Sequence, residues 1–165
     1  AQFREWDYEN PLEWFMVEEY ENHRNYQKFV ANLNKFYLDH SALWENDFSW
    51  EGFNWIVSDD NTNSVIAFVR TDKEDEKIVA VCNFTPVLRK DYKIGVPKGE
   101  SYELVFNSDA KKFGGTGEKI KKTYKTNDGE MHGYKQYIEL TLPPMTTLYF
   151  KQKKAEKPST EKVKK

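Results

Sequence analysis

Two short runs decide the fold, Ser64-Val-Ile-Ala-Phe-Val-Arg70 and Lys77-Ile-Val-Ala-Val-Cys-Asn-Phe84, together with the charged segment Asp72-Lys-Glu-Asp-Glu76 that separates them. Both runs are rich in the β-branched and aromatic residues that favour strands. The polar segment between them is of the kind that joins two neighbouring strands. The three stretches therefore predict a β-hairpin.

Similar runs lie on both sides of this hairpin. Upstream, Phe53, Trp55 and Val57 recur with a period of two, which indicates another strand. Downstream, five more strands are expected, over residues 88–94, 101–106, 120–125, 136–142 and 146–151. Turn-forming residues separate them, at Gly95-Val-Pro-Lys-Gly99, Asn127-Asp-Gly129 and Pro143-Pro144. Seven or eight short strands about ten residues apart, with no helix between them, predict an antiparallel β-sandwich and a mainly β fold.

The first fifty residues have a helical pattern instead. Asn10-Pro11-Leu12-Glu13 has the residues of a capping box with proline at the first helical position, so a short helix is expected to run through Val17. A second helix is expected from about residue 23 to residue 39. Its buried stripe would have helical spacing and consist of Tyr26, Phe29, Val30, Leu33 and Tyr37. Either the sandwich or a further body of protein must cover this aromatic stripe.

Composition places the chain among globular proteins. It has 165 residues and a mass of 19.6 kDa, which suits one domain with or without an appendage. Hydrophobic residues make up 38% and charged residues 32%, and the mean hydropathy is -0.87. The longest apolar runs are too short to span a bilayer, and the N-terminus does not resemble a signal peptide. One cysteine excludes an internal disulfide framework. We therefore expect a cytoplasmic protein without a membrane partner.

The charge is unevenly distributed along the chain. The formal net charge is only -2, but residues 1–50 carry ten acidic and four basic residues. Residues 151–165 carry seven lysines and two glutamates. This basic end lacks a periodic apolar face and the aromatic residues that stack on single-stranded nucleic acid. We expect residues 153–165 to form a disordered basic tail, and we expect no nucleic-acid partner.

Few residues have a pattern that suggests chemistry. His23, His40 and His132 are too scattered to share a metal, so they are expected at the surface or at helix ends. Cys82 lies inside an apolar strand, where a small buried side chain is expected. Gly114-Gly-Thr-Gly117 lacks the Lys-Ser/Thr of a phosphate loop and is expected to be a flexible inter-strand loop. No cofactor is predicted.

The carboxylates are numerous but do not suggest catalysis. Four glutamates crowd the acidic helical segment, namely Glu13, Glu18, Glu19 and Glu21. The aspartates of the strand region occur in predicted turns, where short acidic residues are common, as at Asp59, Asp60, Asp72 and Asp75. None has the apolar neighbourhood that raises a carboxyl pKa for acid catalysis. We predict no catalytic residue and no metal ligand in this chain.

The tryptophans are the ambiguous feature. All five lie in the first third of the chain, at Trp6, Trp14, Trp44, Trp50 and Trp55. Such density is compatible with stacking on sugars. Three of them, Trp14, Trp44 and Trp55, occupy amphipathic positions and are expected in the core. Trp6, on a loop before the first helix, is the best candidate for a ligand contact.

A set of longer stretches resembles the C-terminal part of bacterial 1,4-α-glucan (glycogen) branching enzymes, which belong to the α-amylase superfamily. The resemblance covers about residues 1–152 in order. Three residues depart from it. Asn32 and Asn54 stand where the family usually has acidic residues, and Leu38 stands where an arginine is common. The stretches that carry it are Glu5-Trp6, Asn32-Leu-Asn-Lys-Phe-Tyr37, Ala42-Leu-Trp-Glu-Asn-Asp47, Gly52-Phe-Asn-Trp-Ile56, Ser64–Arg70, Asn83-Phe-Thr-Pro86, Asp91-Tyr-Lys-Ile-Gly-Val-Pro97, Asn107-Ser-Asp109, Gly114-Gly115 and Leu140-Thr-Leu-Pro-Pro144.

The resemblance implies an enzyme that cleaves an α-1,4 bond of a glucan and transfers the released segment to a 6-hydroxyl. It implies a retaining mechanism whose Asp and Glu residues lie in motifs of a (β/α)₈ barrel, and those motifs are absent from this sequence. Residues 1–46 would be the last loop and helix of that barrel, and residues 47–152 the C-terminal β-sandwich of the α-amylase type.

The same resemblance suggests the partners and the site. The partners would be the remaining barrel of the same polypeptide and, through the intact enzyme, α-glucan. Because barrel active sites lie on the loops after the strands, Trp6 and Glu5 would line the glucan groove. The start Ala1-Gln-Phe-Arg-Glu-Trp6, with no initiator methionine, suggests a fragment. The alternative is an autonomous carbohydrate-binding β-sandwich whose tryptophans form an exposed platform.

Overall fold

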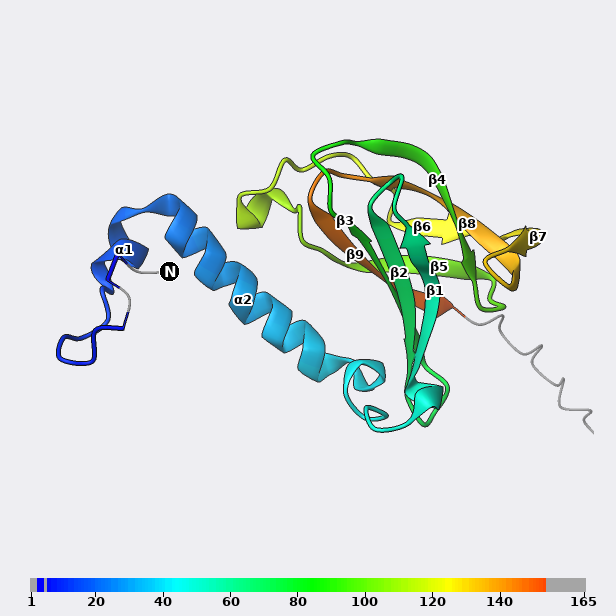
Figure 1. Cartoon of the computed structure of the whole chain (residues 1–165), viewed down its shortest axis with the longest axis horizontal. Coiled ribbons are helices and arrows are strands. Elements are labelled where there is room, and N and C mark those ends of the chain that lie inside the picture. Colours follow the sequence, from blue (N-terminus) through cyan, green and yellow to red (C-terminus); the bar gives the residue numbers. More distant parts are fainter. Residues whose placement is uncertain (1–2, 5, 154–165) are drawn as a thin grey trace, which may run out of the picture.

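The computed structural model describes residues 3–4 and 6–153 and contains two antiparallel sheets preceded by two helices (Figure 1). The predicted fold class is therefore confirmed. The helical elements are α1 (Phe15–Glu19), α2 (Glu21–Asp39) and the short 3₁₀ turns η1 (Ser41–Leu43), η2 (Trp50–Gly52) and η3 (Lys111–Phe113). The strands are β1 (Phe53–Asp60), β2 (Val65–Thr71), β3 (Lys77–Asn83), β4 (Arg89–Val96), β5 (Ser101–Asn107), β6 (Thr123–Lys125), β7 (Asn127–Met131), β8 (Tyr134–Leu142) and β9 (Thr146–Lys153).

The larger sheet has the strand order β1-β2-β3-β9-β5-β6, and the smaller has the order β4-β8-β7. The predicted hairpin is the β2–β3 pair of the larger sheet, in which Thr71 lies opposite Lys77. The turn closes on the Asp72 carboxylate, which accepts hydrogen bonds from the backbone N–H groups of Glu74 (3.0 Å) and Glu76 (2.7 Å). The acidic residues between the two runs are thus turn formers, as expected.

Strand β3 shows why the central run is apolar without alternation. Val79 and Val81 face the core between the sheets, while Ile78 and Ala80 face the other side of the larger sheet and are also fully buried. Helix α2 and η1 cover that second side at this point. The core itself is drawn from both sheets and comprises Ile56, Val57, Val65, Ala67, Val69, Val79, Val81, Ile94, Val96, Tyr102, Tyr124, Ile138, Leu140, Leu142, Leu148 and Phe150.

Two local predictions are wrong. Asn127-Asp-Gly129 was expected to be a turn, but it begins strand β7, which pairs with β8. This strand lies at a sheet edge and its residues are mostly exposed, so no burial pattern marks it in the sequence. Likewise, no capping box forms at Asn10 and Glu13: α1 begins only at Phe15, and the Glu13 carboxylate accepts a hydrogen bond from the Phe3 N–H instead (2.6 Å).

A hydrogen bond between the sheets yields a pH-dependent prediction. The Tyr92 hydroxyl on β4 donates to Asp60 at the end of β1 (2.6 Å). Burial raises the pKa of Asp60, but bonds from Tyr92 and Asn63 outweigh this effect and hold the pKa below its ordinary 3.8. A carboxyl with a lowered pKa stabilises the fold above its unfolded pKa and loses that contribution as the pH falls through its folded pKa.

We therefore expect Tyr92→Phe to lower the free energy of unfolding by about 1–2 kcal/mol at pH 7. The difference from wild type should shrink as the pH falls through the folded pKa of Asp60, which lies below 3.8. Urea unfolding followed by circular dichroism at pH 7 and pH 3 measures both quantities. A difference that stays constant between the two pH values would contradict the role given to the ionised carboxylate.

Candidate functional site

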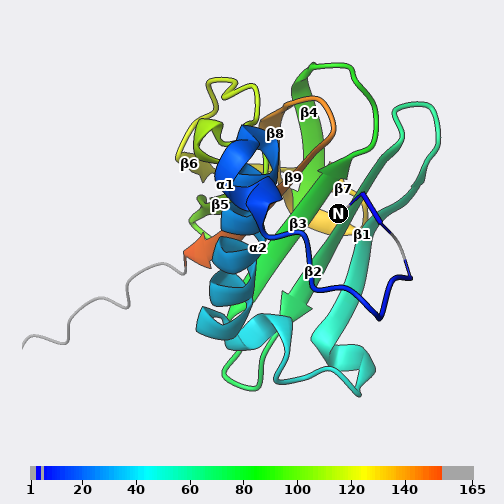
Figure 2. The same cartoon turned by 90° about the vertical axis from the view of Figure 1, so that its left-hand side faces the viewer.

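Helix α2 lies across the outer face of the larger sheet and is fixed there by aromatic side chains (Figure 2). Phe36 packs against Phe106 of β5 and Tyr149 of β9, with ring centroids 5.0 and 5.1 Å away. Two turns nearer the N-terminus, the ring of Phe29 lies 5.4 Å from that of Phe113 of η3. We call these five residues the helix clamp. They join the helical segment to the sandwich.

The helix clamp corrects the predicted stripe. Phe29 is used as expected, but the buried residue of α2 is Phe36, which the prediction omitted. Tyr26 and Tyr37, predicted to be buried, are 60% and 44% exposed. The row from Phe29 through Phe36 to His40 has helical spacing as good as that of the predicted row. Sequence spacing alone cannot select between two neighbouring rows of one helix.

The loop between β5 and β6 holds the outer side of the clamp. The Asp109 carboxylate accepts bonds from the Thr116 N–H (2.7 Å) and the Thr116 hydroxyl (2.5 Å). Gly115 is required at its position, because a Cβ atom there would lie 2.3 Å from the Asp109 carbonyl oxygen. The loop presents Phe113 to α2, and the Lys112 ammonium donates to Asn32 Oδ1 (3.2 Å). The glycine-rich segment is an inter-strand loop, as predicted, but bonds to Asp109 hold it, whereas a flexible loop was expected. Lys112 and Phe113, just before it, contact α2.

Polar contacts hold the C-terminal end of α2. His40 follows the helix, and its Nδ1 lies 3.4 Å from Glu76 Oε1 in the β2–β3 turn. Glu76 also pairs with Lys151 of β9. The Ser41 hydroxyl donates to Asp72 of the same turn. The hairpin that decides the fold therefore also fixes the point where the helix enters the sandwich.

On the opposite side of α2 there is an apolar cavity of about 550 Å³ between α1 and α2. Its lining includes Met16 and Val17 of α1 and Tyr26 and Val30 of α2. At about 100° per residue, Val30 and its neighbours face away from Phe29 and Phe36. Figure 1 shows that this part of the helix projects beyond the sandwich. We call this the interhelical cavity; the sandwich leaves it open.

The predicted ligand contacts lie at the start of the chain. Trp6 is 97% exposed and has a positive φ of 58°, so its indole projects into solvent. The structure does not bring it to the interhelical cavity. Glu5 lies outside the described residues. The Trp6 and Glu5 site therefore stays a prediction.

The tryptophans expected in the core are at the surface. Trp14, Trp44 and Trp55 are 60%, 42% and 53% exposed, so their predicted burial is wrong. Trp55 shows the reason. It lies on the outer face of the larger sheet, next to Phe53 and Phe68 and not between the sheets. Strand alternation identifies two faces but does not say which one is the core.

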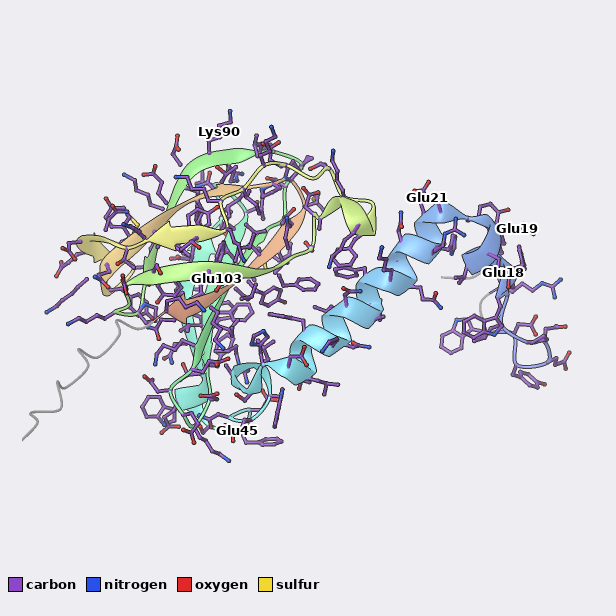
Figure 3. The ribbon with its side chains drawn as sticks, turned by 180° about the vertical axis from the view of Figure 1, so that it is seen from behind. Glu18, Glu19, Glu21, Glu45, Lys90 and Glu103 are labelled. Atoms are coloured by element: carbon purple, nitrogen blue, oxygen red, sulfur yellow. The ribbon has the colours of Figure 1, made fainter. Side chains whose placement is uncertain are left out.

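The described carboxylates are spread over different parts of the fold. Figure 3 places Glu18, Glu19 and Glu21 at the end of the helical segment away from the sandwich, with Glu45 and Glu103 elsewhere. Among the described carboxyl groups, those whose pKa is shifted are Asp7, Glu51, Asp60 and Glu103, and each pKa is lowered. For Glu103 the largest cause is a hydrogen bond from Lys153. Such groups stay ionised at neutral pH, whereas a general acid needs a raised pKa.

The histidines and the cysteine have structural surroundings. The His40 ring packs against Phe36 in a tilted arrangement, and His132, in the β7–β8 turn, accepts a hydrogen bond at Nδ1 from the Gly95 N–H (3.1 Å). Cys82 is buried as predicted, and burial raises the pKa of its thiol. Across residues 3–4 and 6–153, no group of His, Cys, Asp and Glu residues could hold a metal ion. Within the same residues, no helix has the length and apolar character needed to cross a membrane.

Comparison with known proteins identifies the sandwich. A family model described as alpha amylase, C-terminal all-beta domain matches residues 55–153, more than half of the chain. The chain belongs to this family. The matched α-amylase C-terminal domain includes most of β1 and all the other strands, and it ends at Lys153 with β9. The two helices precede the matched part.

Relatives of this α-amylase C-terminal domain protein extend the similarity into the helices. The chain is 44% identical over 155 residues to a 1,4-alpha-glucan branching enzyme GlgB of Francisella philomiragia, a match that covers 93% of this chain. Proteins of the same name from Halothermothrix orenii and Aquifex aeolicus are 41% and 44% identical over 152 residues, or 92% of the chain. In all three cases the match covers 24% of the relative, so the chain spans about a quarter of their length.

Proposed function

We propose that this chain is the C-terminal, non-catalytic segment of a 1,4-α-glucan branching enzyme. Such an enzyme cleaves an α-1,4 bond and transfers the glucan segment to a 6-hydroxyl, which forms an α-1,6 branch in glycogen. The observation that carries the proposal is the identity of 40–44% to branching enzymes over almost the whole chain, helices included. A match confined to the sandwich would not distinguish among enzymes that carry this domain. A glycogen enzyme of this kind would act in the cytoplasm.

The proposal divides the chain by role. Residues 1–46 are the last loop and helix of a (β/α)₈ barrel, and residues 47–152 are the sandwich. The tail was predicted to start at residue 153, but Lys153 is the last residue of β9, so the basic tail comprises residues 154–165, which lie outside the described residues. The apolar interhelical cavity supports this division, because exposed apolar surface of this kind marks an interaction site. In the intact enzyme the barrel covers the face of α2 around Val30, while the helix clamp holds the opposite face. The segment thus supports the barrel.

The proposal assigns the chemistry to the barrel. A retaining glycosyl transfer needs a nucleophilic carboxylate and a second carboxyl group that acts first as acid and then as base. The ionised, hydrogen-bonded carboxylates of this chain suit turn and strand contacts. What the segment contributes to the reaction is position: it fixes the last barrel helix and the loop that carries Trp6.

A chimaera tests the proposal. In the Aquifex aeolicus relative, the 152 matched residues would be replaced by this chain, and branching would be followed by the spectral shift of the iodine–glucan complex. We expect the chimaera to branch amylose, and we expect both the truncated relative and the isolated chain to be inactive. Branching by the isolated chain, or a folded but inactive chimaera, would overturn the proposal.

Trp6 is proposed as a glucan contact on the rim of the barrel, together with Glu5. In the chimaera, Trp6→Ala should lower kcat/KM for amylose about tenfold, the effect of losing one stacked aromatic contact. Trp44→Ala, which changes another exposed tryptophan of residues 1–46 that does not line the interhelical cavity, is the matched control. An unchanged kcat/KM in the Trp6 variant would remove this residue from the groove.

A second candidate function is an autonomous carbohydrate-binding β-sandwich. The exposure of the tryptophans favours it, since large exposed indoles are the usual stacking surface for sugar rings. The two candidates differ in the result of the chimaera. An autonomous module does not restore branching to the truncated relative.

A further inference from the structure

We propose that the sandwich itself holds an α-glucan chain in a pocket centred on Trp50, separate from the barrel groove. The pocket has a volume of about 510 Å³ and lies where η2 enters β1 and meets the β2–β3 turn. It is lined by Asn46, Trp50, Glu51, Asn54, Thr71, Asp72, Lys73, Asp75 and Lys77. We call it the Trp50 pocket. The choice of α-glucan as the ligand rests on the proposed function.

Part of the pocket lies on the face of the larger sheet away from the helix clamp. Asn54 lies opposite the core residue Val69, and Thr71 lies opposite Lys77, so these side chains are on the core-facing side of the larger sheet. The helix clamp is on the other side, because its Tyr149 pairs with Ala80 and not with the core row. A barrel that covers α2 would therefore lie against the opposite face of the sheet.

The backbone around Trp50, the aromatic residue that lines the pocket, is held in place by close packing. Trp50 is 78% exposed, although it belongs to a tightly packed turn. A Cβ atom on Gly52 would lie 1.8 Å from the Asn46 carbonyl oxygen, so only glycine lets the turn pack this closely against the backbone of Asn46. The Ser49 hydroxyl donates to Asn46 Oδ1 (2.6 Å) and fixes the same turn. The indole is thus presented to solvent by a fixed support.

The polar rim suits a ligand with many hydroxyl groups. Asn46 accepts at Oδ1, which leaves its Nδ2 amide to donate, and Asn54 offers both kinds of group. Glu51 adds a carboxylate, which accepts hydrogen bonds at neutral pH. The lining contains three acidic and two basic residues and is close to neutral. An aromatic face with mixed donors and acceptors and little net charge fits a neutral sugar better than an anion or a cation.

The test measures binding of maltoheptaose by the 165-residue chain with calorimetry, and retardation in native gels that contain glycogen. Trp50→Ala should weaken both about tenfold or more, as for a central aromatic contact. Trp50→Tyr should retain most of the binding, and Asn54→Ala should weaken it. The matched control is Trp14→Ala, which removes an exposed indole at the interhelical cavity and should change the affinity less than about twofold. Cellohexaose, whose glucose units are joined by β-1,4 linkages, tests whether binding requires α-linkages, and we expect it to bind more weakly than maltoheptaose.

The possible results distinguish the Trp50 pocket from the proposed function. No binding by the wild-type chain, unchanged binding in a folded Trp50→Ala variant, or equal losses in the Trp14 and Trp50 variants would each overturn the Trp50 pocket. Circular dichroism checks the fold of each variant, and the exposure of Trp50 makes its substitution mild for stability. If the chimaera branches amylose while Trp50→Ala leaves glucan binding unchanged, the pocket fails and the proposed function stands. Equal binding of cellohexaose and maltoheptaose would contradict the choice of α-glucan.

Discussion

Phe36→Ala should lower the free energy of unfolding by about 3–5 kcal/mol, the range for truncating a buried phenylalanine. Phe36 is only 7% exposed and contacts aromatic rings from β5, β9 and the end of its own helix. Its removal leaves a cavity that the rigid sheet cannot close, so α2 should also detach before the sandwich unfolds. Urea unfolding gives the loss of stability, and amide hydrogen exchange shows which element has lost protection.

Tyr37→Ala is the control for this prediction. Tyr37 is the next residue of the same helix and is of similar size, but it lies 44% exposed on the side not used by the clamp. We expect it to change the free energy of unfolding by less than about 1 kcal/mol. Equal effects of the two substitutions, or unchanged exchange of the α2 amides in Phe36→Ala, would show that the helix clamp does not hold the helix.

Asn83→Ala should also cost about 3–5 kcal/mol of stability, because a buried polar centre loses all its bonds at once. Asn83 ends β3 and is 2% exposed. Its Nδ2 donates to the carbonyls of Val87 (2.8 Å) and Pro143 (2.9 Å), and its Oδ1 accepts from the Thr85 N–H and hydroxyl. These bonds connect the crossover from the larger sheet to the smaller one with the β8–β9 turn. Thermal and urea unfolding measure the loss.

Two further variants sharpen the Asn83 prediction. Asn83→Asp keeps the shape and the acceptor, but its carboxylate would face the carbonyl oxygens of Val87 and Pro143, so it should destabilise as well. Asn61→Ala, in the exposed β1–β2 turn, should stay within about 0.5 kcal/mol of wild type. Wild-type stability in Asn83→Asp would mean that the two donated bonds contribute nothing.

Local sequence was enough for the β-sandwich. The runs that became β2 and β3 are too apolar and too β-branched for a surface loop, and Asp72 supplies the turn between them. The positions of most strands and of α2 followed from the same kind of reasoning. The exception was β7, an exposed edge strand held by backbone pairing to β8, which leaves no pattern in its side chains.

The candidate sites depended far more on tertiary structure. From the sequence, the tryptophans could be either core residues or ligand contacts. The structure shows that they are exposed, and that Trp55 lies on the outer face of the larger sheet. The Trp50 pocket combines residues from η2, β1 and the β2–β3 turn. No local pattern relates these segments, because their proximity is produced by strand pairing.

By itself, the sequence determined the class of fold and most of the secondary structure, since periodicity and turn residues act over a few neighbouring positions. Tertiary structure decided which row of α2 is buried, because Phe29 and Phe36 and the predicted row through Tyr26 and Tyr37 are both helical faces. The choice depends on where β5, β9 and η3 place their own aromatic rings, and those positions are set by contacts between residues far apart in the chain.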